Sequence, residues 1–492
     1  MRDGKTGAQR MTRAGLAAWH HPGIRVSGHL GIRASGHVIL PDLPVHMAMV
    51  FAGASRREEH RPLRSVRHRV ETALMAGTRS CPVLGTEGLP GLSDTRFVRD
   101  PHPALAALRR NAPVHFDAGT GLWLVSRYAD VRQVLLDPAA YLPDNAQHAV
   151  SPLSMPTLRG LARARFALPP ALANNSGSTH AELRRLVTRF FNADRVSAAV
   201  PLIEETAREM MADLSDRYAS GHPTDIAAEY AQLLPCRVMM RLLGVDGISD
   251  TTLTTWSDAA LELFYGWPSA ERQTRLGELV GDFYRWLAAQ VARDAPADGL
   301  IGSLRGHRLS SGEPLDASTA VAVCFFVFIA GQSTTGQLIS TALLRALAEP
   351  EAWARAATED GFAEAWVEEI LRREPPVTTW RRVTAHEVEL SGTKLPAGSQ
   401  LLLMLMGTGS DPEVFEEPEV MRPYRDNIRH HLSFGVGRHR CPGASLARTE
   451  AAVALRTAAR LLPDAVLAEE GDPPMLGLLS FRAPLSVVVR RS

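Results

Sequence analysis

The sequence lacks an apolar run of membrane-spanning length. Its longest uninterrupted apolar stretch, residues 320–330, is well short of the ~18 residues that a spanning helix needs, so we expect no membrane association. The four cysteines, Cys81, Cys236, Cys324 and Cys441, are scattered and form no C-x-x-C pair. That spacing indicates neither a disulfide framework nor a zinc site. It is typical of a protein in a reducing cytoplasm.

The sequence also lacks an excess of charge of either sign. The formal net charge of +1 gives no reason to expect a nucleic-acid partner. Lysine is nearly absent, because Lys5 and Lys394 are the only two and almost all positive charge is arginine. We draw no functional conclusion from that bias.

The positive charge is concentrated at the start of the chain. Residues 1–80 contain thirteen Arg and Lys against five Asp and Glu, a net charge of +8, which leaves −7 for the rest of the chain. Three interpretations stay open: a disordered extension, an Arg-rich transit peptide, and a translation start assigned too far upstream. We favour the last, with Met75 as the true start, and expect residues 1–75 to be dispensable. Residues 81–492 are then expected to form one large domain.

One stretch, residues 431–450, organises the rest of the chain. It reads HLSFGVGRHRCPGASLARTE and places one cysteine between a glycine-rich turn and the start of a helix. Its pattern F-G-x-G-x-H-x-C-x-G comprises Phe434, Gly435, Gly437, His439, Cys441 and Gly443. A buried structural cysteine beside a helix cap is the alternative interpretation. The pattern resembles the haem-ligand loop of the cytochrome P450 superfamily, the haem-thiolate monooxygenases.

The resemblance implies that Cys441 is the thiolate ligand of a haem iron. Such a thiolate pushes electron density onto the iron and favours O–O cleavage. We expect backbone N–H groups and the positive end of the following helix to face the sulfur, because both favour the deprotonated form. Gly435 and Gly437 allow positive φ and a close approach to the porphyrin, and Phe434 is expected to shield the sulfur from water.

A second segment, residues 180–191, predicts an amphipathic helix. His180 and Arg184 lie one turn apart on it, so both can reach one anion; an exposed charged face is the alternative. In the family that the motif resembles, this pair matches residues that hold a haem propionate. The resemblance implies the same role for Arg382 and His439.

Residues 316–347 form the longest predicted helix, apolar nearly all round in its first half and therefore expected to be buried. Within it lies AGQSTTG, where Gly331 costs about 1 kcal/mol relative to alanine. The hydroxyls of Thr334 and Thr335 favour local opening of the helix; ordinary back-bonding to a carbonyl one turn earlier is the alternative. The resemblance implies that this is the oxygen-binding notch, with Thr334 beside the oxygen. Ser333 stands where the family usually has an acid, so the usual proton-delivery group is missing.

Other segments carry weaker signals. Glu369 and Arg372 form the E-x-x-R of the family, an ion pair expected to tie its helix to the loop before Cys441, although such pairs are common on surface helices. Residues 144–179 are expected to be a long irregular stretch over the substrate side. An aromatic cluster, residues 263–267, is a candidate roof for the pocket, and plain core is its alternative. The tip of a closing hairpin over residues 475–489, near Leu478 and Leu479, is a candidate substrate contact.

Taken together, the resemblance implies a mainly α fold with a small β-region, the cytochrome P450 fold in a single large domain. We expect a soluble, monomeric, cytoplasmic monooxygenase that binds haem b and oxidises a small apolar or peptide-like metabolite. No flavin or iron–sulfur motif is present, so electrons from NAD(P)H are expected to arrive through a ferredoxin reductase and a ferredoxin. Arg438 and Arg440 are the first candidates for ferredoxin docking. The alternatives are oxidative coupling, a peroxide-driven reaction, and a haem-binding or sensor protein without turnover.

Overall fold

A computed structural model describes residues 91–492, except residues 294 and 297–298. The predicted extension, residues 1–80, with the favoured start Met75, lies outside the described residues, as does Cys81.

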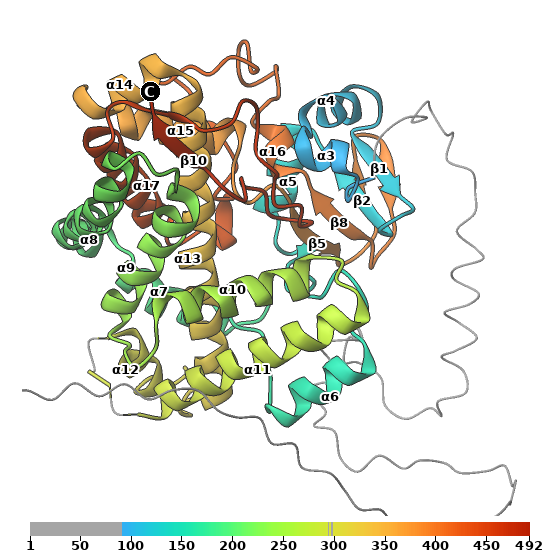
Figure 1. Cartoon of the computed structure of the whole chain (residues 1–492). Helices are drawn as coiled ribbons and strands as arrows, with labels where there is room; N and C mark the ends of the chain where they lie inside the picture. The colour runs from blue at the N-terminus through green and yellow to red at the C-terminus, as the bar shows by residue number, and fades with distance from the viewer. Residues whose placement is uncertain (1–90, 294, 297–298) are drawn as a thin grey trace, which may run out of the picture. The chain divides into compact units, whose positions relative to one another are not determined.

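Helices make up most of the described chain (Figure 1). They are α3 (Thr95–Arg99), α4 (His102–Asn111), α5 (Tyr128–Leu136), α6 (Met155–Arg163), α7 (His180–Phe190), α8 (Ala193–Ala219), α9 (Leu233–Leu243), α10 (Asp250–Tyr265), α11 (Ala270–Ala292), α12 (Leu300–Arg305), α13 (Ala317–Ala348), α14 (Pro350–Thr358), α15 (Phe362–Arg373), α16 (Leu405–Thr408) and α17 (Ala444–Leu461). A π-helix (Ala227–Ala231) and two 3-10 turns (Ile428–His430 and Gly437–His439) complete them.

The strands form three small sheets. The largest has the order β1-β2-β8-β5-β3, the second β4-β10-β9, and β6 pairs with β7 in a hairpin. Their bounds are β1 (Val114–Asp117), β2 (Leu122–Val125), β3 (Tyr141–Leu142), β4 (Thr224–Asp225), β5 (Trp380–Thr384), β6 (Val388–Leu390), β7 (Thr393–Leu395), β8 (Gln400–Leu403), β9 (Ala465–Leu467) and β10 (Val488–Arg491). All neighbouring strands are antiparallel except β2 and β8. The fold is therefore mainly α with a small β-region, as predicted.

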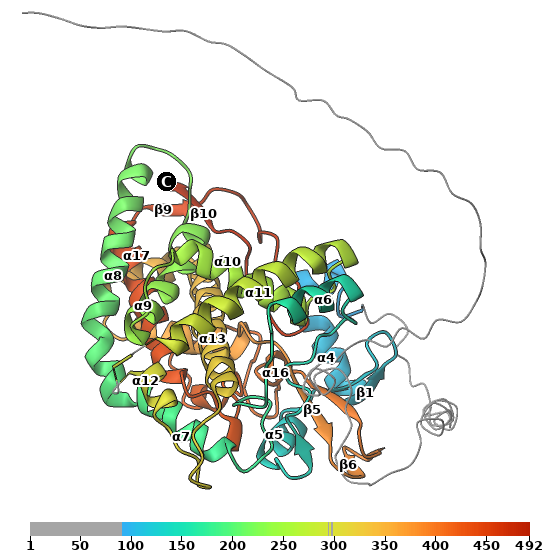
Figure 2. The same ribbon diagram turned by 90° about the horizontal axis from the view of Figure 1, so that it is seen from below.

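Helix α13 is the centre of the helical part, and Figures 1 and 2 show it surrounded by other helices. The Asp316 carboxylate caps it by accepting from the N–H groups of Ser318 and Thr319. Its buried side chains pack against α9, α10, α11 and α17. Among the described residues it is the one helix whose length and composition would suit a membrane crossing, and its contacts are those of a core helix.

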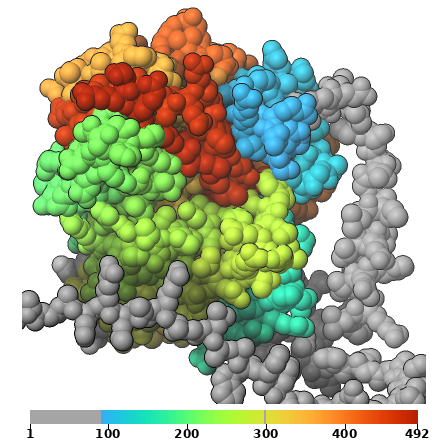
Figure 3. Space-filling view, viewed as in Figure 1, coloured from blue at the N-terminus to red at the C-terminus, as the bar shows by residue number. Residues whose placement is uncertain are grey.

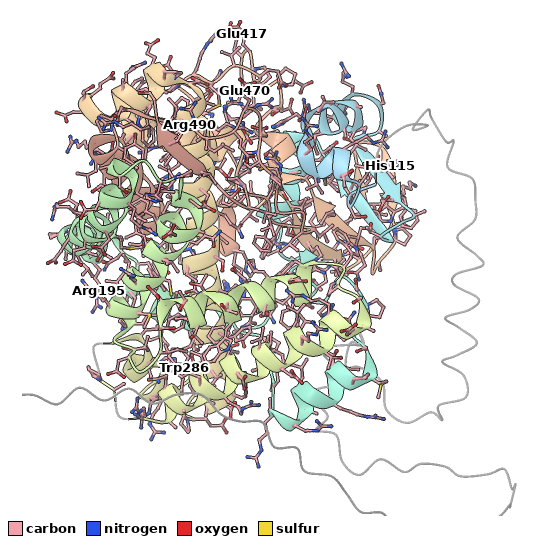
Figure 4. All side chains as sticks on the ribbon, viewed as in Figure 1. His115, Arg195, Trp286, Glu417, Glu470 and Arg490 are labelled. Carbon is pink, nitrogen blue, oxygen red and sulfur yellow. The ribbon has the colours of Figure 1, made fainter. Side chains whose placement is uncertain are left out.

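Aromatic side chains hold α10 and α11 against α13. Trp286 on α11, labelled in Figure 4, lies 6.1 Å between ring centroids from Trp256 on α10. Phe283, one turn earlier on α11, lies 4.9 Å from Phe325 of α13. Aromatic pairs at these separations contribute about 1 kcal/mol each beyond their area, so they help to hold the three helices together.

The helices predicted over residues 180–191 and 316–347 are present as α7 and α13, and one prediction needs correction. The stretch 144–179, predicted to be irregular, contains α6, which Ser154 caps by accepting from the Thr157 N–H.

Candidate active site

Cys441 lies in the loop that immediately precedes α17. Its backbone N–H donates to the carbonyl of Phe434 (2.8 Å), which closes the loop into a tight turn. Gly435 and Gly437 have φ values of +64° and +76°, in the region that side chains rarely adopt. The predicted positive φ is confirmed at both glycines.

The surroundings of the Cys441 thiol act on its pKa in two directions. Burial raises the pKa, whereas the Gly443 N–H and the nearby charges of Arg184, Arg440 and Arg448 lower it, and burial prevails. The predicted N–H donor and the start of α17 are therefore beside the sulfur. A thiolate needs a further positive charge close to it here, which a bound metal ion supplies.

A cavity of about 250 Å³ lies between α13 and the Cys441 loop. Most of its wall is apolar, with Leu168, Leu172, Phe325, Phe326, Ile329 and Leu338 among the lining residues. Eight of the predicted site residues border it: His180, Arg184, Thr334, Arg382, Phe434, Gly435, His439 and Cys441. The fold thus brings together segments that are up to 261 positions apart in the chain, from α7 to the Cys441 loop.

Four of these residues place positive charge or hydrogen-bonding groups on the cavity wall: His180, Arg184, Arg382 and His439. Arg382, on β5, is buried, and burial lowers its pKa to about 10. Its guanidinium donates to the carbonyl of Arg381 (2.8 Å), and among the described residues it has no carboxylate partner. The ring of His439 lies 4.4 Å from that of His180, and its Nε2 is buried without a hydrogen-bond partner.

The two histidines are held in their neutral forms. Burial and the charge of Arg438 lower the pKa of His180 to about 4, while burial and the charge of Arg382 lower that of His439 to about 3. An anion in the cavity would reverse both effects. An apolar cavity with one thiol, two arginines and an unpartnered imidazole nitrogen is complementary to an apolar ring that carries carboxylates and a metal ion, so the residues present fit haem.

The centre of α13 differs from the predicted notch. The helix is continuous from Ala317 to Ala348, and the Thr334 hydroxyl donates to the Ala330 carbonyl (2.6 Å), so the alternative of back-bonding one turn earlier is confirmed. Gly331 does not line the cavity. A Cβ atom there would lie 2.9 Å from the Met239 side chain, so this glycine allows α9 to approach α13.

Ser333 also faces away from the large cavity. Its hydroxyl donates to the Asp258 carboxylate on α10 (3.3 Å). Sequence reasoning missed Asp258, because nothing in the residues around it distinguishes it from any other acid on an amphipathic helix. Only the packing of α10 against α13 brings the two side chains together.

Glu369 and Arg372 form the predicted ion pair, with two N–O distances of 2.8 Å and both side chains fully buried. Arg372 also donates to the carbonyls of Gly409 (2.5 Å) and Pro418 (2.8 Å). The pair therefore joins α15 to the segment that leads to the Cys441 loop, as predicted. Arg425 adds a second cation to Glu369 at 3.1 Å.

The candidate pocket roof is confirmed in part. Phe264 and Tyr265 line the cavity, whereas Leu263 is buried in the core and Trp267 lies on a different cavity. The hairpin near residue 480 contributes Phe481 to the wall. Its predicted contact residues, Leu478 and Leu479, line other cavities instead.

The comparisons with known proteins agree on one family. Residues 289–461 match the family model described as Cytochrome P450. The chain is 33% identical to Vitamin D(3) 25-hydroxylase of Pseudonocardia autotrophica over 380 residues, 75% of this chain and 88% of the relative. It is 29% identical to 6-deoxyerythronolide B hydroxylase of Saccharopolyspora erythraea over 78% of this chain and 94% of the relative. The heme domain of a P450 from Tepidiphilus thermophilus has a similar structure, with a TM-score of 0.76 at 27% identity, over 82% of this chain and 96% of that one.

Proposed function

The chain belongs to the cytochrome P450 superfamily and is a monooxygenase of that family, and from this premise we propose that it hydroxylates or otherwise oxidises a small, mainly apolar or peptide-like metabolite. Haem b, when bound, supplies the oxygen-activating chemistry of a thiolate-ligated iron. The observation that carries the proposal is the convergence of the Cys441 thiol and the Arg382 and His439 side chains on one apolar cavity.

Within this proposal each side chain has a defined task. Cys441 ligates the iron, and the Gly443 N–H donates to its sulfur. His180, Arg184, Arg382 and His439 hold the two propionates, the arginines through charge-assisted hydrogen bonds. Phe434 keeps water from the sulfur, and the positive φ of Gly435 and Gly437 shapes the loop. Thr334, which lines the cavity together with Ala330 and Thr335, is assigned to the side on which oxygen binds.

The substrate class follows from the cavity wall. Phe264, Phe325, Ile329 and Leu338 present apolar surface to the cavity, and burying such surface is what binds an apolar ligand. Polar groups are few there, with Gln147 and Thr335 among them. Two of the relatives are hydroxylases that act, by name, on vitamin D(3) and on 6-deoxyerythronolide B, which supports an apolar substrate for this chain.

We propose that electrons reach the protein from NAD(P)H through a ferredoxin reductase and a ferredoxin, with the monomeric enzyme in the cytoplasm. An acidic ferredoxin would bind exposed arginines near the Cys441 loop. Arg438 and Arg440 are both exposed, but Arg438 turns inward and donates to His180 Nδ1 (3.1 Å) and the Gly177 carbonyl (2.8 Å). Among the described residues nothing accepts from the Arg440 guanidinium, so Arg440 is the stronger candidate.

Two measurements test the proposal. The purified haem protein is screened with apolar and peptide-like ligands for a low-spin to high-spin shift, which reports occupation of the cavity. Cys441→Ala is then compared with Cys236→Ala, a buried cysteine on α9. We expect the Cys441 variant alone to lose the thiolate-type spectrum of the CO-bound ferrous protein. Retention of that spectrum in Cys441→Ala would overturn the proposed function.

A further inference from the structure

A second cavity, of about 450 Å³, lies on the other side of α13. Its wall includes side chains of α10 and α13, Ser93, Gln232, residues 266–268, and residues 476–478 and 483–485 of the C-terminal segment. On the face drawn in Figure 3, the C-terminal segment (red) meets both α10 and α11 (yellow-green) and the first described helices (blue). The cavity is therefore built where chain segments from the start, middle and end of the described residues meet.

Helix α13 separates the two cavities. Ser333 and Gln337, four positions apart, line the second cavity, whereas Thr334 and Leu338 line the first. Consecutive helix residues are rotated by about 100°, so residues 333 and 334 lie on adjoining faces of one helix. Leu261 of α10 borders both cavities, which makes it part of the thin wall between them.

Asp258 is the acid of the second cavity. It comes from α10, borders the cavity and remains exposed there, and its Oδ1 accepts a hydrogen bond from the Ser333 hydroxyl (3.3 Å). The protein atoms around the carboxyl raise its pKa to about 6, and the Ser333 hydrogen bond opposes that rise. The direction of this shift keeps Asp258 protonated to a higher pH than an ordinary surface aspartate.

No charged partner accounts for Asp258. The titratable or charged groups on the helices around it are Cys236, Arg237 and Arg241 on α9, Asp250, Glu262 and Tyr265 on α10, and Glu271, Arg272, Arg275, Glu278, Asp282, Tyr284 and Arg285 on α11. Arg237 pairs with Asp250, Arg272 with Glu262, Arg275 with Glu271 and Arg285 with Asp282. None of these groups contributes to the pKa shift of Asp258. Burial raises the pKa of Cys236 to about 12, so it is a neutral thiol. The C-terminal residues that border the cavity are uncharged. Among the described residues, Asp258 has no ion pair.

We propose that Asp258 supplies from α10 the carboxylate that related enzymes carry at position 333 on α13, and that Asp258 and Ser333 together pass protons from the second cavity towards the Thr334 side of the helix. The inference rests on the proposed function, since it assigns a proton source to that reaction. In this proposal the chain keeps a proton relay although position 333 is a serine, because the acid is provided by the neighbouring helix α10.

The proton transfer balances without a further reagent. Protonated Asp258 gives its proton to the Ser333 oxygen, while the Ser333 O–H bond breaks and that proton passes to a water molecule on the Thr334 side of the helix. Water in the second cavity then returns a proton to the Asp258 carboxylate. No electrons move, so the step requires only water and the two side chains.

The first test measures protonation and not turnover. In the full-chain haem protein without substrate, infrared difference titration should show a carboxyl band with a midpoint near pH 6 that disappears in Asp258→Asn. Ser333→Ala should shift this midpoint upwards, because the Ser333 hydrogen bond lowers the pKa of Asp258. Glu262→Gln, one turn along α10 and paired with Arg272, is the matched control and should keep the band. A carboxyl that titrates near pH 4, or that ignores Ser333→Ala, would overturn the inference.

The second test moves the carboxylate between helices. NADPH oxidation with saturating ferredoxin and reductase is measured in H₂O and D₂O. Asp258→Asn should slow NADPH oxidation about tenfold and increase its solvent isotope effect. The expected loss is smaller than the 10²–10⁴-fold contribution of a fully positioned general acid, because water in the cavity replaces part of the relay. Ser333→Asp/Asp258→Asn should recover most of the rate. A rate within twofold of wild type in Asp258→Asn would refute the relay, whereas loss of haem or of the thiolate spectrum in wild type would instead refute the proposed function.

Discussion

Replacing Arg372 by methionine tests how the frame of the Cys441 loop is held. Methionine keeps an unbranched chain of similar length but removes all donors. The substitution leaves the buried Glu369 without its two 2.8 Å bonds and removes the donor of the Gly409 and Pro418 carbonyls. The variant therefore breaks one side of a buried network and leaves the other side in place.

The expected loss can be worked from these contacts. Removing one partner of a buried ion pair costs about 3–5 kcal/mol, and each carbonyl left without a donor costs about 1 kcal/mol or more. Glu369 keeps Arg425 at 3.1 Å and the Arg422 N–H at 2.8 Å, which reduces the penalty on its charge. We therefore expect a loss of about 4 kcal/mol, a large part of the roughly 5–15 kcal/mol that stabilises a typical protein.

Urea unfolding of the haem protein, followed by the haem absorbance and by circular dichroism, measures this loss. Arg355→Met is the control, because Arg355 forms an exposed i,i+4 pair with Glu359 and should leave the unfolding midpoint unchanged. The double variant Glu369→Leu/Arg372→Leu should recover part of the stability, since removing both charges is less harmful than isolating one. A loss of less than about 1 kcal/mol in Arg372→Met would refute the reasoning.

Three further outcomes are expected. Arg440→Glu should weaken ferredoxin-dependent reduction at low salt while leaving ligand-induced spin shifts intact, and Arg438→Glu should also disturb haem binding; equal, purely salt-dependent effects would contradict the assignment. Asp258→Asn should raise the melting temperature above pH 6 and leave it unchanged below pH 4. The pKa of Asp258 is about 6 in the folded state against 3.8 for a free aspartate, so the folded state loses stability as the pH rises between these values. The difference corresponds to about 3 kcal/mol, which water in the cavity reduces to about 1 kcal/mol. A stability gain at pH 4 would contradict this. Gly435→Ala should cost about 1–2 kcal/mol in urea unfolding through its positive φ alone, since an added Cβ meets no atom closer than 3.9 Å.

The sequence by itself determined the features that are local in the chain. The Cys441 loop, its positive-φ glycines and the helix that follows depend on residues within ten positions of one another, so their order in the chain specifies their geometry. The Glu369–Arg372 pair is local for the same reason, because i,i+3 positions face each other on any helix. Periodicity likewise located α7 and α13.

Tertiary structure decided whatever depends on how helices pack. Gly331 has the composition of a helix opening, but Met239 on α9 gives it a packing role. Arg438 looks like a free surface charge, yet α7 brings His180 within hydrogen-bond distance of it. From the sequence, Ser333 indicates that an acid is missing; in the structure, α10 places Asp258, 75 positions earlier in the chain, beside it. Each outcome depends on side chains that meet across a helix interface, and no spacing within one segment encodes which residue the neighbouring helix presents.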